Sequence, residues 1–482
     1  MRKDNMYVGI IFHLLSKISF VAGSYAMHFF LGRYLPEAEY GIVGTILTIM
    51  NFEYIFFTDG VRQGMAKAIS MQKYEEKALI RTGLLFQMGI VLVFFAGTYL
   101  GAPLIAGALG DMGLTPYIRN LAFLLPFTGL YSLMLGILNG HKCFRAEAGA
   151  GILYPILKLS VIPMVLFGFR DAIFATQMGF LFAAVLISAF SAFEVFRIRK
   201  LAHQAKEHIS RMEYFRTATS YLLLFGASTF MMNLDTLILK RVSGDNETVG
   251  YYTGVANFAK IPYYLLTAIY TVILPVVTGY YIQGELKRAQ EKIGDVMGLV
   301  LAFILPVITA VSACSGHLLS IFYRPTYRIG ATALSILIFA IAFLGMALVF
   351  SMILSAADQK RTMIILSVGM LILQAVLCVI FTKLWSLTGT AAATFLAAGI
   401  GMLLSGSRVI SIFGSFWQKK HTLLLFGNLA AYAFMLIFFL KMTVGSFFML
   451  VLFCGLWYLL LAGFGAALLG LPAKLLTHFK SR

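Results

Sequence analysis

Continuous apolar runs, each close to the length of a membrane span, recur along the whole of this 482-residue chain. A helix of roughly 20 apolar residues matches the hydrocarbon core of a bilayer. The chain is 60% hydrophobic and 12% charged, with a mean hydropathy of +0.87, whereas soluble domains hold about a quarter charged residues. The runs are continuous and do not alternate with polar residues as membrane β-strands do. We therefore predict an all-α polytopic membrane protein.

Fourteen transmembrane helices can be assigned to these runs by their apolar lengths. The predicted spans are 7–33, 41–66, 83–108, 117–139, 149–169, 171–196, 216–239, 250–278, 292–322, 329–356, 361–384, 386–413, 421–441 and 444–470. With the N-terminus in the cytoplasm, most of the 38 Lys and Arg residues fall on that side. Because cytoplasmic loops collect Lys and Arg, we predict that both chain ends are cytoplasmic. This topology accounts for the net charge of +18, and we expect no nucleic-acid partner.

The longest polar connection is "RIRKLAHQAKEHISRMEYFR", residues 197–216. Its apolar residues recur at helical spacing, with basic residues opposite them. This pattern predicts an amphipathic helix on the cytoplasmic membrane face. A plain solvated linker is the alternative.

The segments before and after this linker resemble each other. "LGRYLPEAEYG" (31–41) and "LKRVSGDNETVG" (239–250) both lead into a span, and "ILNGHKCFR" (137–145) has a counterpart in "ILSAADQKR" (353–361). Six spans in each half give both halves the same direction, which is a parallel repeat. We predict two six-helix lobes around a central cavity, plus two extra C-terminal helices. The corresponding boundaries are 1–196 for the N-terminal lobe, 197–216 for the linker, 217–413 for the C-terminal lobe and 414–482 for the last two helices and a cytoplasmic tail.

Three lysines lie about ten residues into their spans: Lys17 in span 1, Lys158 in span 5 and Lys260 in span 8. A charge at the bilayer centre costs roughly 2.5–3.5 kcal/mol on insertion scales. Such a side chain is therefore expected to face protein, water or a counter-ion. Lys260 stands beside Pro262 and several Tyr residues, where the proline permits a bend and the rings could stack on sugars or merely pack.

Span 1 carries the clearest polar pattern. His13, Lys17, Ser24 and His28 fall within an arc of about 60° on a helix, and the remaining residues are mostly apolar. This stripe predicts a polar face inside the membrane. The alternative is a lysine paired with a carboxylate in a packed core, with satisfied histidines nearby.

Span 2 and span 7 carry the remaining candidates. Asn51, Asp59 and Arg62 share one face of span 2, and Asp59 could pair with Arg62 three residues on. Glu53 points elsewhere, as the partner of an intramembrane lysine or as a proton site. Asp235, near the outer end of span 7, could be a gate, a cation ligand or an interfacial cap.

These residues also carry a family resemblance. "GRYLPEAEYG" followed by a span ending "DGVRQG", and "NLDTLILKR" followed by "VGYYTGVANFAKIPYYLLTAIYTVILP", resemble the Wzx-type oligosaccharide flippases. This family belongs to the multidrug/oligosaccharidyl-lipid/polysaccharide (MOP) exporter superfamily, which also holds the lipid II flippases and the MATE drug exporters. The resemblance covers most of the chain and agrees with a count of fourteen spans.

The resemblance implies a flippase that moves an undecaprenyl-pyrophosphate-linked oligosaccharide to the outer leaflet of the bacterial cytoplasmic membrane by alternating access, for surface polysaccharide biosynthesis. It implies a cationic cavity lined by spans 1, 2, 7 and 8. Lys17 and Lys260 match basic cavity positions, and Arg62 matches one more weakly. The substrate-binding set expected here is Lys17, Lys260, Lys158, Arg62, His13, His28 and Asn51, and the coupling or gating set is Asp235, Glu53 and Asp59. Coupling to H⁺ or Na⁺ and association with a polysaccharide polymerase are further expectations.

Two other classes of protein were weighed. A MATE-like multidrug exporter shares the architecture but favours acidic or neutral cavities, which the lysines disfavour. An enzyme is not expected, because we find no P-loop, HExxH motif or Ser/His/Asp arrangement. The four cysteines contain no CxxC pair, so neither a disulfide framework nor a metal site is predicted, and no cofactor is expected.

Overall fold

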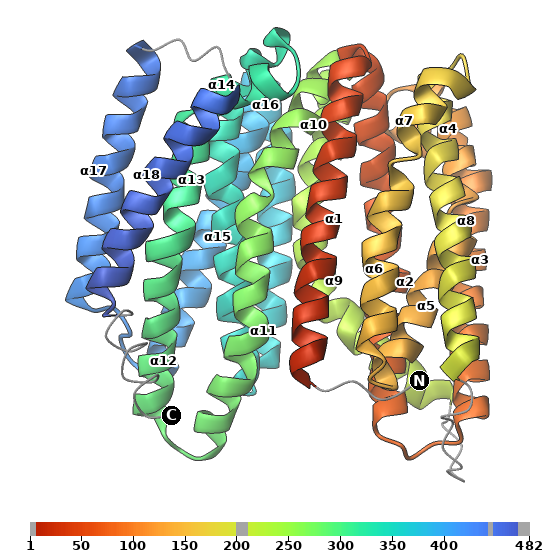
Figure 1. Ribbon diagram of the computed structural model, residues 1–482, viewed down its shortest axis with the longest axis horizontal. Helices are drawn as coiled ribbons and strands as arrows, with labels where there is room; N and C mark the ends of the chain where they lie inside the picture. Colours follow the sequence, from red (N-terminus) through yellow and green to blue (C-terminus); the bar gives the residue numbers. More distant parts are fainter. Residues whose placement is uncertain (1–5, 199–210, 442–446, 471–482) are drawn as a thin grey trace. The chain divides into compact units, whose positions relative to one another are not determined.

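A computed structural model describes residues 6–198, 211–441 and 447–470 (Figure 1). Within these ranges the regular structure is helical and contains no strand. The chain divides into two compact units, Met1–Gly250 and Tyr251–Arg482. Each unit is described by itself below.

Unit 1 is built from nine α-helices and the start of a tenth within its described residues. They are α1 (Met6–Tyr34), α2 (Glu37–Ser70), α3 (Glu76–Ala108), α4 (Thr115–Ala122), α5 (Leu125–Gly140), α6 (Phe144–Lys158), α7 (Val161–Pro163), α8 (Ala172–Ile198), α9 (Arg211–Ser243) and the first residues of α10 (Asn246–Ala259). A 3₁₀ turn, η1 (Met112–Leu114), precedes α4, and a π-helical turn, η2 (Met164–Gly168), follows α7. α2 packs between α5 and α9, and α1 lies alongside α6.

Unit 2 continues α10 and contains the remaining helices. They are α11 (Ile261–Ile282), α12 (Leu286–Leu299), the π-helical η4 (Val300–Ile304), α13 (Leu305–Ala313), α14 (Ser315–Phe322), the 3₁₀ turn η5 (Pro325–Gly330), α15 (Ala331–Ala356), α16 (Lys360–Phe413), α17 (Lys419–Lys441) and α18 (Phe447–Leu468). α15 is the most buried long helix and packs against α11 and α16. α17 and α18 both contact α13.

The described residues of each of the fourteen predicted spans fall mainly on helical structure. Nine helical stretches are individually long and apolar enough to cross a membrane, and the bent pair Met112–Ala122 and Leu125–Gly140 forms a tenth, among the described residues. Predicted spans 11 and 12 are the two halves of α16, which breaks at Trp385 and Ser386. Predicted span 8 is α10 followed by α11, broken at Lys260 just before Pro262. The prediction of an all-α polytopic membrane protein is confirmed.

The internal repeat is visible in the backbone of two turns. Lys142 after α5 and Asp358 after α15 both adopt left-handed conformations, with φ of 59° and 58°. In the first turn Cys143 N–H donates to Leu138 O at 3.0 Å, and in the second Gln359 N–H donates to Leu354 O at 2.9 Å. These bonds, six residues across, define the same helix-ending motif. The two quoted segments that suggested the repeat therefore fold alike.

The linker prediction falls mostly outside the described residues. Residues 199–210 are not described, and residues from Arg211 onward are the first turns of α9. α9 packs against α2 within unit 1, although the sequence pattern assigns residues 217–239 to the second lobe. The predicted domain boundaries remain a prediction.

Two glycines let the starts of α2 and α10 approach closely. A Cβ placed on Gly41 would collide with the backbone carbonyl oxygen of Asn246, and one on Gly250 would collide with that of Glu37. Because these obstacles are backbone atoms, neither neighbour can rotate away. The two glycines therefore fix the contact between the first turns of α2 and α10.

We expect Gly41→Ala to destabilise the protein by about 3 kcal/mol, near the upper end of the usual cost of overpacking. Thermal unfolding of the purified protein in detergent measures the loss. Gly89→Ala on α3 is the matched control, because a Cβ there meets nothing within 4 Å. Equal unfolding midpoints for the two variants would show that the α2–α10 contact does not need a glycine.

Candidate functional site

Lys17 lies near the middle of α1, and its side chain is exposed. The neighbouring serines seat the helix on α6: Ser19 Oγ donates to the carbonyl of Ile152 at 3.2 Å, and Ser16 fills the space beside Gly151. Small residues of this kind let helices in a membrane approach closely. The packing against α6 thus fixes the rotation of α1 and leaves the Lys17 side chain at the surface of the helix.

The other members of the span 1 stripe are only partly placed. His28 Nδ1 lies 3.1 Å from the Tyr40 hydroxyl, so this histidine is linked to the start of α2. His13 is part of α1, but its side chain lies outside the described residues. The continuous polar face of span 1 stays a prediction.

Lys158, the last residue of α6, lies among aromatic rings. Its Nζ is 4.5 Å from the ring centroid of Tyr154, 5.5 Å from that of Phe180 and 6.0 Å from that of Phe20. Ring faces attract cations within about 6 Å. No carboxylate forms an ion pair with Lys158 among the residues that the structure describes. The rings that contact its ammonium come from α1, α6 and α8 of unit 1.

Lys260 occupies the break between α10 and α11. It precedes Ile261, the first residue of α11, and Pro262 follows within the first turn. A proline at that position needs no backbone donor bond, which is why the helix can restart there. The side chain of Lys260 is half-buried. The boundary between α10 and α11 thus lies where Pro262 permits a bend.

Arg62 forms an ion pair that the sequence did not predict. Its Nη2 lies 2.5 Å from Oε1 of Glu147, and Asn139 Nδ2 donates to Oε2 of the same carboxylate at 2.8 Å. These contacts tie α2 to α5 and α6. The side chain of Asp59, the predicted local partner, lies outside the described residues. Arg62 therefore has a structural role beside any contact with a substrate.

Glu53 is buried on α2, where its Oε1 accepts a hydrogen bond from the Thr98 hydroxyl of α3. Its Oε2 has no hydrogen-bond partner among the described residues. The sequence left two roles open for Glu53, the partner of an intramembrane lysine or a proton site. The hydrogen bond observed here comes from a threonine hydroxyl and not from a lysine.

Polar side chains of α9 form hydrogen bonds with α2 or with the backbone of α9 itself. Asn51 Nδ2 donates to Asn233 Oδ1 at 3.2 Å, which joins α2 to α9. Asp235 is buried, and its Oδ1 accepts the backbone N–H of Thr236 at 2.7 Å. These contacts place Asn51 and Asp235 in the packed region of unit 1 around α9.

A buried ion pair joins the turn after α3 to the end of α9. Lys240 is fully buried, and its Nζ lies 2.7 Å from Oδ2 of Asp111. Asn246 bonds both groups, and Gly113 N–H donates to the other oxygen of Asp111 at 3.0 Å. Burial raises the pKa of Asp111, but the bonds from Lys240 and Asn246 outweigh it and hold the pKa below its usual value. Nothing in the local sequence around Lys240 reveals a partner 129 residues away.

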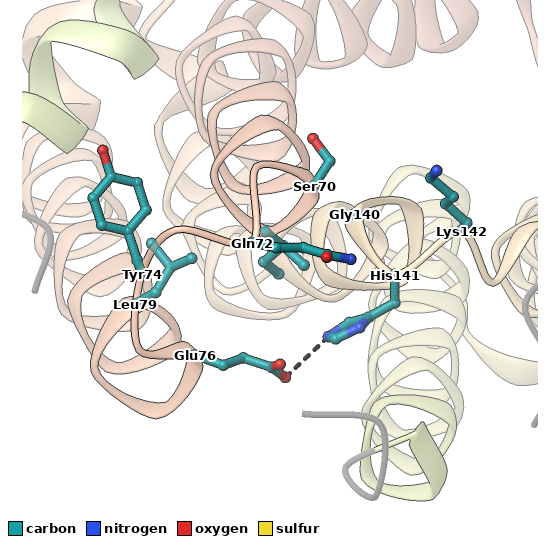
Figure 2. A pocket seen from close by; sticks show the side chains of 9 residues that line it. Ser70, Gln72, Tyr74, Glu76, Leu79, Gly140, His141 and Lys142 are labelled. Carbon is teal, nitrogen blue, oxygen red and sulfur yellow. Dashed lines mark hydrogen bonds and ion pairs between the residues drawn. The ribbon is translucent and has the colours of Figure 1, made fainter. Parts of the chain in front are cut away.

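A hydrogen-bonded histidine and glutamate line a small open pocket at the other end of α3. His141 Nε2, at the end of α5, lies 2.9 Å from Oε1 of Glu76, at the start of α3. Figure 2 shows the two side chains facing each other, with Gln72 and Lys142 on the surrounding turns. The position of this pocket at two loops of the predicted cytoplasmic side suits a clasp between helix ends.

The described residues contain no group of three or more His, Cys, Asp or Glu side chains that could hold a metal ion. The polar contacts described above are ion pairs, a lysine among aromatic rings and hydrogen bonds to hydroxyl groups.

Residues 30–328 match the family described as polysaccharide biosynthesis protein, and this match covers more than half of the chain. The chain belongs to this family.

Two relatives of this polysaccharide biosynthesis protein are similar over most of their lengths. It is 23% identical to the lipid II flippase MurJ of Bacillus subtilis (strain 168) over 420 residues, which covers 77% of this chain and 75% of the relative. It is 20% identical over 365 residues to an uncharacterized membrane protein of Methanocaldococcus jannaschii, which covers 71% of each chain.

Solved structures establish the fold of this family member. The lipid II flippase MurJ in an inward closed conformation has a TM-score of 0.76 at 16% identity, covering 96% of this chain and 99% of the other. An inward-facing MATE family transporter of the MOP superfamily has a TM-score of 0.70 at 13% identity, with 82% and 98% covered. The protein is therefore a multi-pass membrane protein with the fold of the MOP exporter superfamily, as the sequence motifs indicated.

Proposed function

We propose that this protein flips an undecaprenyl-pyrophosphate-linked oligosaccharide from the inner to the outer leaflet of the bacterial cytoplasmic membrane. Membership of the polysaccharide biosynthesis protein family supports this proposal. So does the relationship to a protein named as a lipid II flippase. Both point to transport rather than to catalysis.

The proposal is carried by Lys17, an exposed residue near the middle of α1 and within predicted span 1. A pyrophosphate crossing the bilayer loses its hydration and needs an opposite charge. At 4 Å two unit charges attract each other by about 4 kcal/mol at an effective dielectric constant near 20. Lysine is a compact point charge, so it can lower the barrier without a bidentate grip that would delay release.

Lys260 and Lys158 supply further cations within the predicted spans. Lys260 stands between α10 and α11, two residues before Pro262. Lys158 is caged by aromatic rings, so we assign it a supporting electrostatic role. Arg62, already paired with Glu147, contributes mainly to the structure.

Transport coupled to H⁺ or Na⁺ is part of the proposal. Glu53 is the stronger coupling candidate, because it is buried and one of its oxygens has no hydrogen-bond partner among the described residues. Asp235 is the second candidate. Cytoplasmic N- and C-termini and an association with a polysaccharide polymerase are also proposed.

A MATE-like export of cationic drugs is the alternative function, and it is supported by the TM-score of 0.70 to a MATE family transporter. Mid-span lysines would repel such cations. The two functions therefore differ in the sign of the charge that they must carry.

Reconstitution into liposomes tests the proposal. A defined polyprenyl-pyrophosphate oligosaccharide is placed in one leaflet, and its arrival in the other is followed with and without an imposed ion gradient. We expect translocation of this lipid and no transport of a lipophilic cation. Drug transport without glycolipid translocation would favour the MATE-like alternative.

A further inference from the structure

Two cysteine thiols from distant helices are in contact in unit 2. The Sγ atoms of Cys314 and Cys454 lie 3.7 Å apart, although the two residues are 140 positions apart in the chain. Cys314 ends α13, and Cys454 lies within α18. We propose that these residues form an oxidisable dithiol, a modification site that can close to a disulfide and fasten α18 to α13.

The packing around the pair holds the two sulfur atoms together. Cys314 is buried in a cluster with Met435, Phe439 and Leu450, and Cys454 packs against the same cluster. A disulfide has a sulfur–sulfur bond of about 2.05 Å, so the two sulfur atoms must approach by roughly 1.7 Å. Rotation of the Cys454 side chain, which is only partly buried, can supply part of this movement.

The two cysteines also lie at similar depth in the proposed topology. Cys314 stands eight residues before the end of α14 at Phe322, and Cys454 stands seven residues after the start of α18 at Phe447. At a rise of about 1.5 Å per residue, both lie roughly 11–12 Å from those helix ends. The proposed orientation puts both ends on the outer side, where disulfides persist.

The reaction needs a two-electron acceptor that dissolves in lipid, for which we name a quinone. The two S–H bonds break and one S–S bond forms, while two protons and two electrons pass to the quinone and give the quinol. The other two cysteines are matched controls. Cys143 and Cys378 are buried in other parts of the fold, where their thiols contact the backbone carbonyls of His141 and Thr390.

Oxidation of the reconstituted full-length protein tests the site. The protein is treated with a lipid-soluble quinone or with copper–phenanthroline, alkylated under denaturing conditions and analysed by mass spectrometry without reductant. We expect a peptide linking Cys314 to Cys454, with alkylated cysteines falling from four to two. The linked peptide should disappear in Cys454→Ser and persist in Cys143→Ser and Cys378→Ser.

A second measurement covers the effect on the fold. Closing a loop of this length constrains the unfolded chain, so the oxidised wild type should unfold at a higher temperature than the reduced protein. Cys454→Ser should show no such difference. Four alkylatable cysteines after both oxidants, or a link to Cys143 or Cys378, would overturn the proposal. None of these results depends on whether the protein flips a lipid.

Discussion

Lys17→Ala should lose translocation of the pyrophosphate-linked oligosaccharide, with a rate at least roughly 100-fold below that of the wild type. This magnitude follows from about 4 kcal/mol for a charge pair in contact at an effective dielectric constant near 20, of which about 3 kcal/mol suffices for 100-fold. The side chain is exposed, so its removal leaves the contacts of Ser16 and Ser19 with α6 in place. Translocation in proteoliposomes measures the loss.

Two control variants separate charge from general damage. Lys17→Arg keeps the cation but can grip the pyrophosphate bidentately, so its rate should lie well above that of Lys17→Ala and below that of the wild type. Lys77→Ala removes an exposed lysine in the first turn of α3, outside predicted span 3, and should transport normally. Unimpaired translocation by a folded Lys17→Ala protein would refute the role of this lysine.

Asp111→Ala should destabilise unit 1 by about 3 kcal/mol. The substitution leaves Lys240, which is fully buried, without its carboxylate partner, and breaking such pairs typically costs about 3–5 kcal/mol. We expect the lower end of that range, because Asn246 still bonds the ammonium. Thermal or denaturant unfolding in detergent gives the change in free energy of unfolding.

The matched control removes both charges. Asp111→Asn combined with Lys240→Met leaves no buried charge uncompensated and should recover most of the stability lost in Asp111→Ala. If the double variant is as unstable as the single one, the cost arises from packing and not from an unpaired charge.

The same ion pair predicts a pH dependence. The pKa of Asp111 is lower in the folded protein than in the unfolded chain, where it is about 3.9. The pair therefore stabilises the fold fully above that value, and its contribution is lost as the pH falls through the lower, folded pKa. Acid unfolding of the wild type should be steeper in this range than that of the doubly uncharged variant.

The membrane fold could be predicted from the sequence because its signal is local. The length of each apolar run gives the length of a membrane span. Pro262 lies at the boundary between α10 and α11. The repeat could be recognised because the sequences around the turns at Lys142 and Asp358 resemble each other. The boundary between predicted spans 11 and 12 coincides with the kink at Trp385 and Ser386, where the backbone leaves helical geometry.

The partners of the charged residues could not be predicted, because they are far away in the chain. Arg62 and Glu147 are 85 residues apart, and Lys240 and Asp111 are 129 apart. Helical periodicity shows which residues share one helix face, but it does not show what that face meets. For the same reason Lys158 could be recognised as a mid-span cation, whereas its cage of rings from α1, α6 and α8 could not.

The central claim is that lysines within the predicted membrane spans lower the electrostatic barrier for a pyrophosphate that crosses the bilayer. The most direct measurement compares two lipid-linked oligosaccharides that share the same polyprenyl chain and glycan, one joined through pyrophosphate and the other through an uncharged linker. In proteoliposomes the protein should translocate the pyrophosphate-linked lipid and leave the uncharged one at the rate of protein-free vesicles. Equal rates for the two lipids would contradict the account.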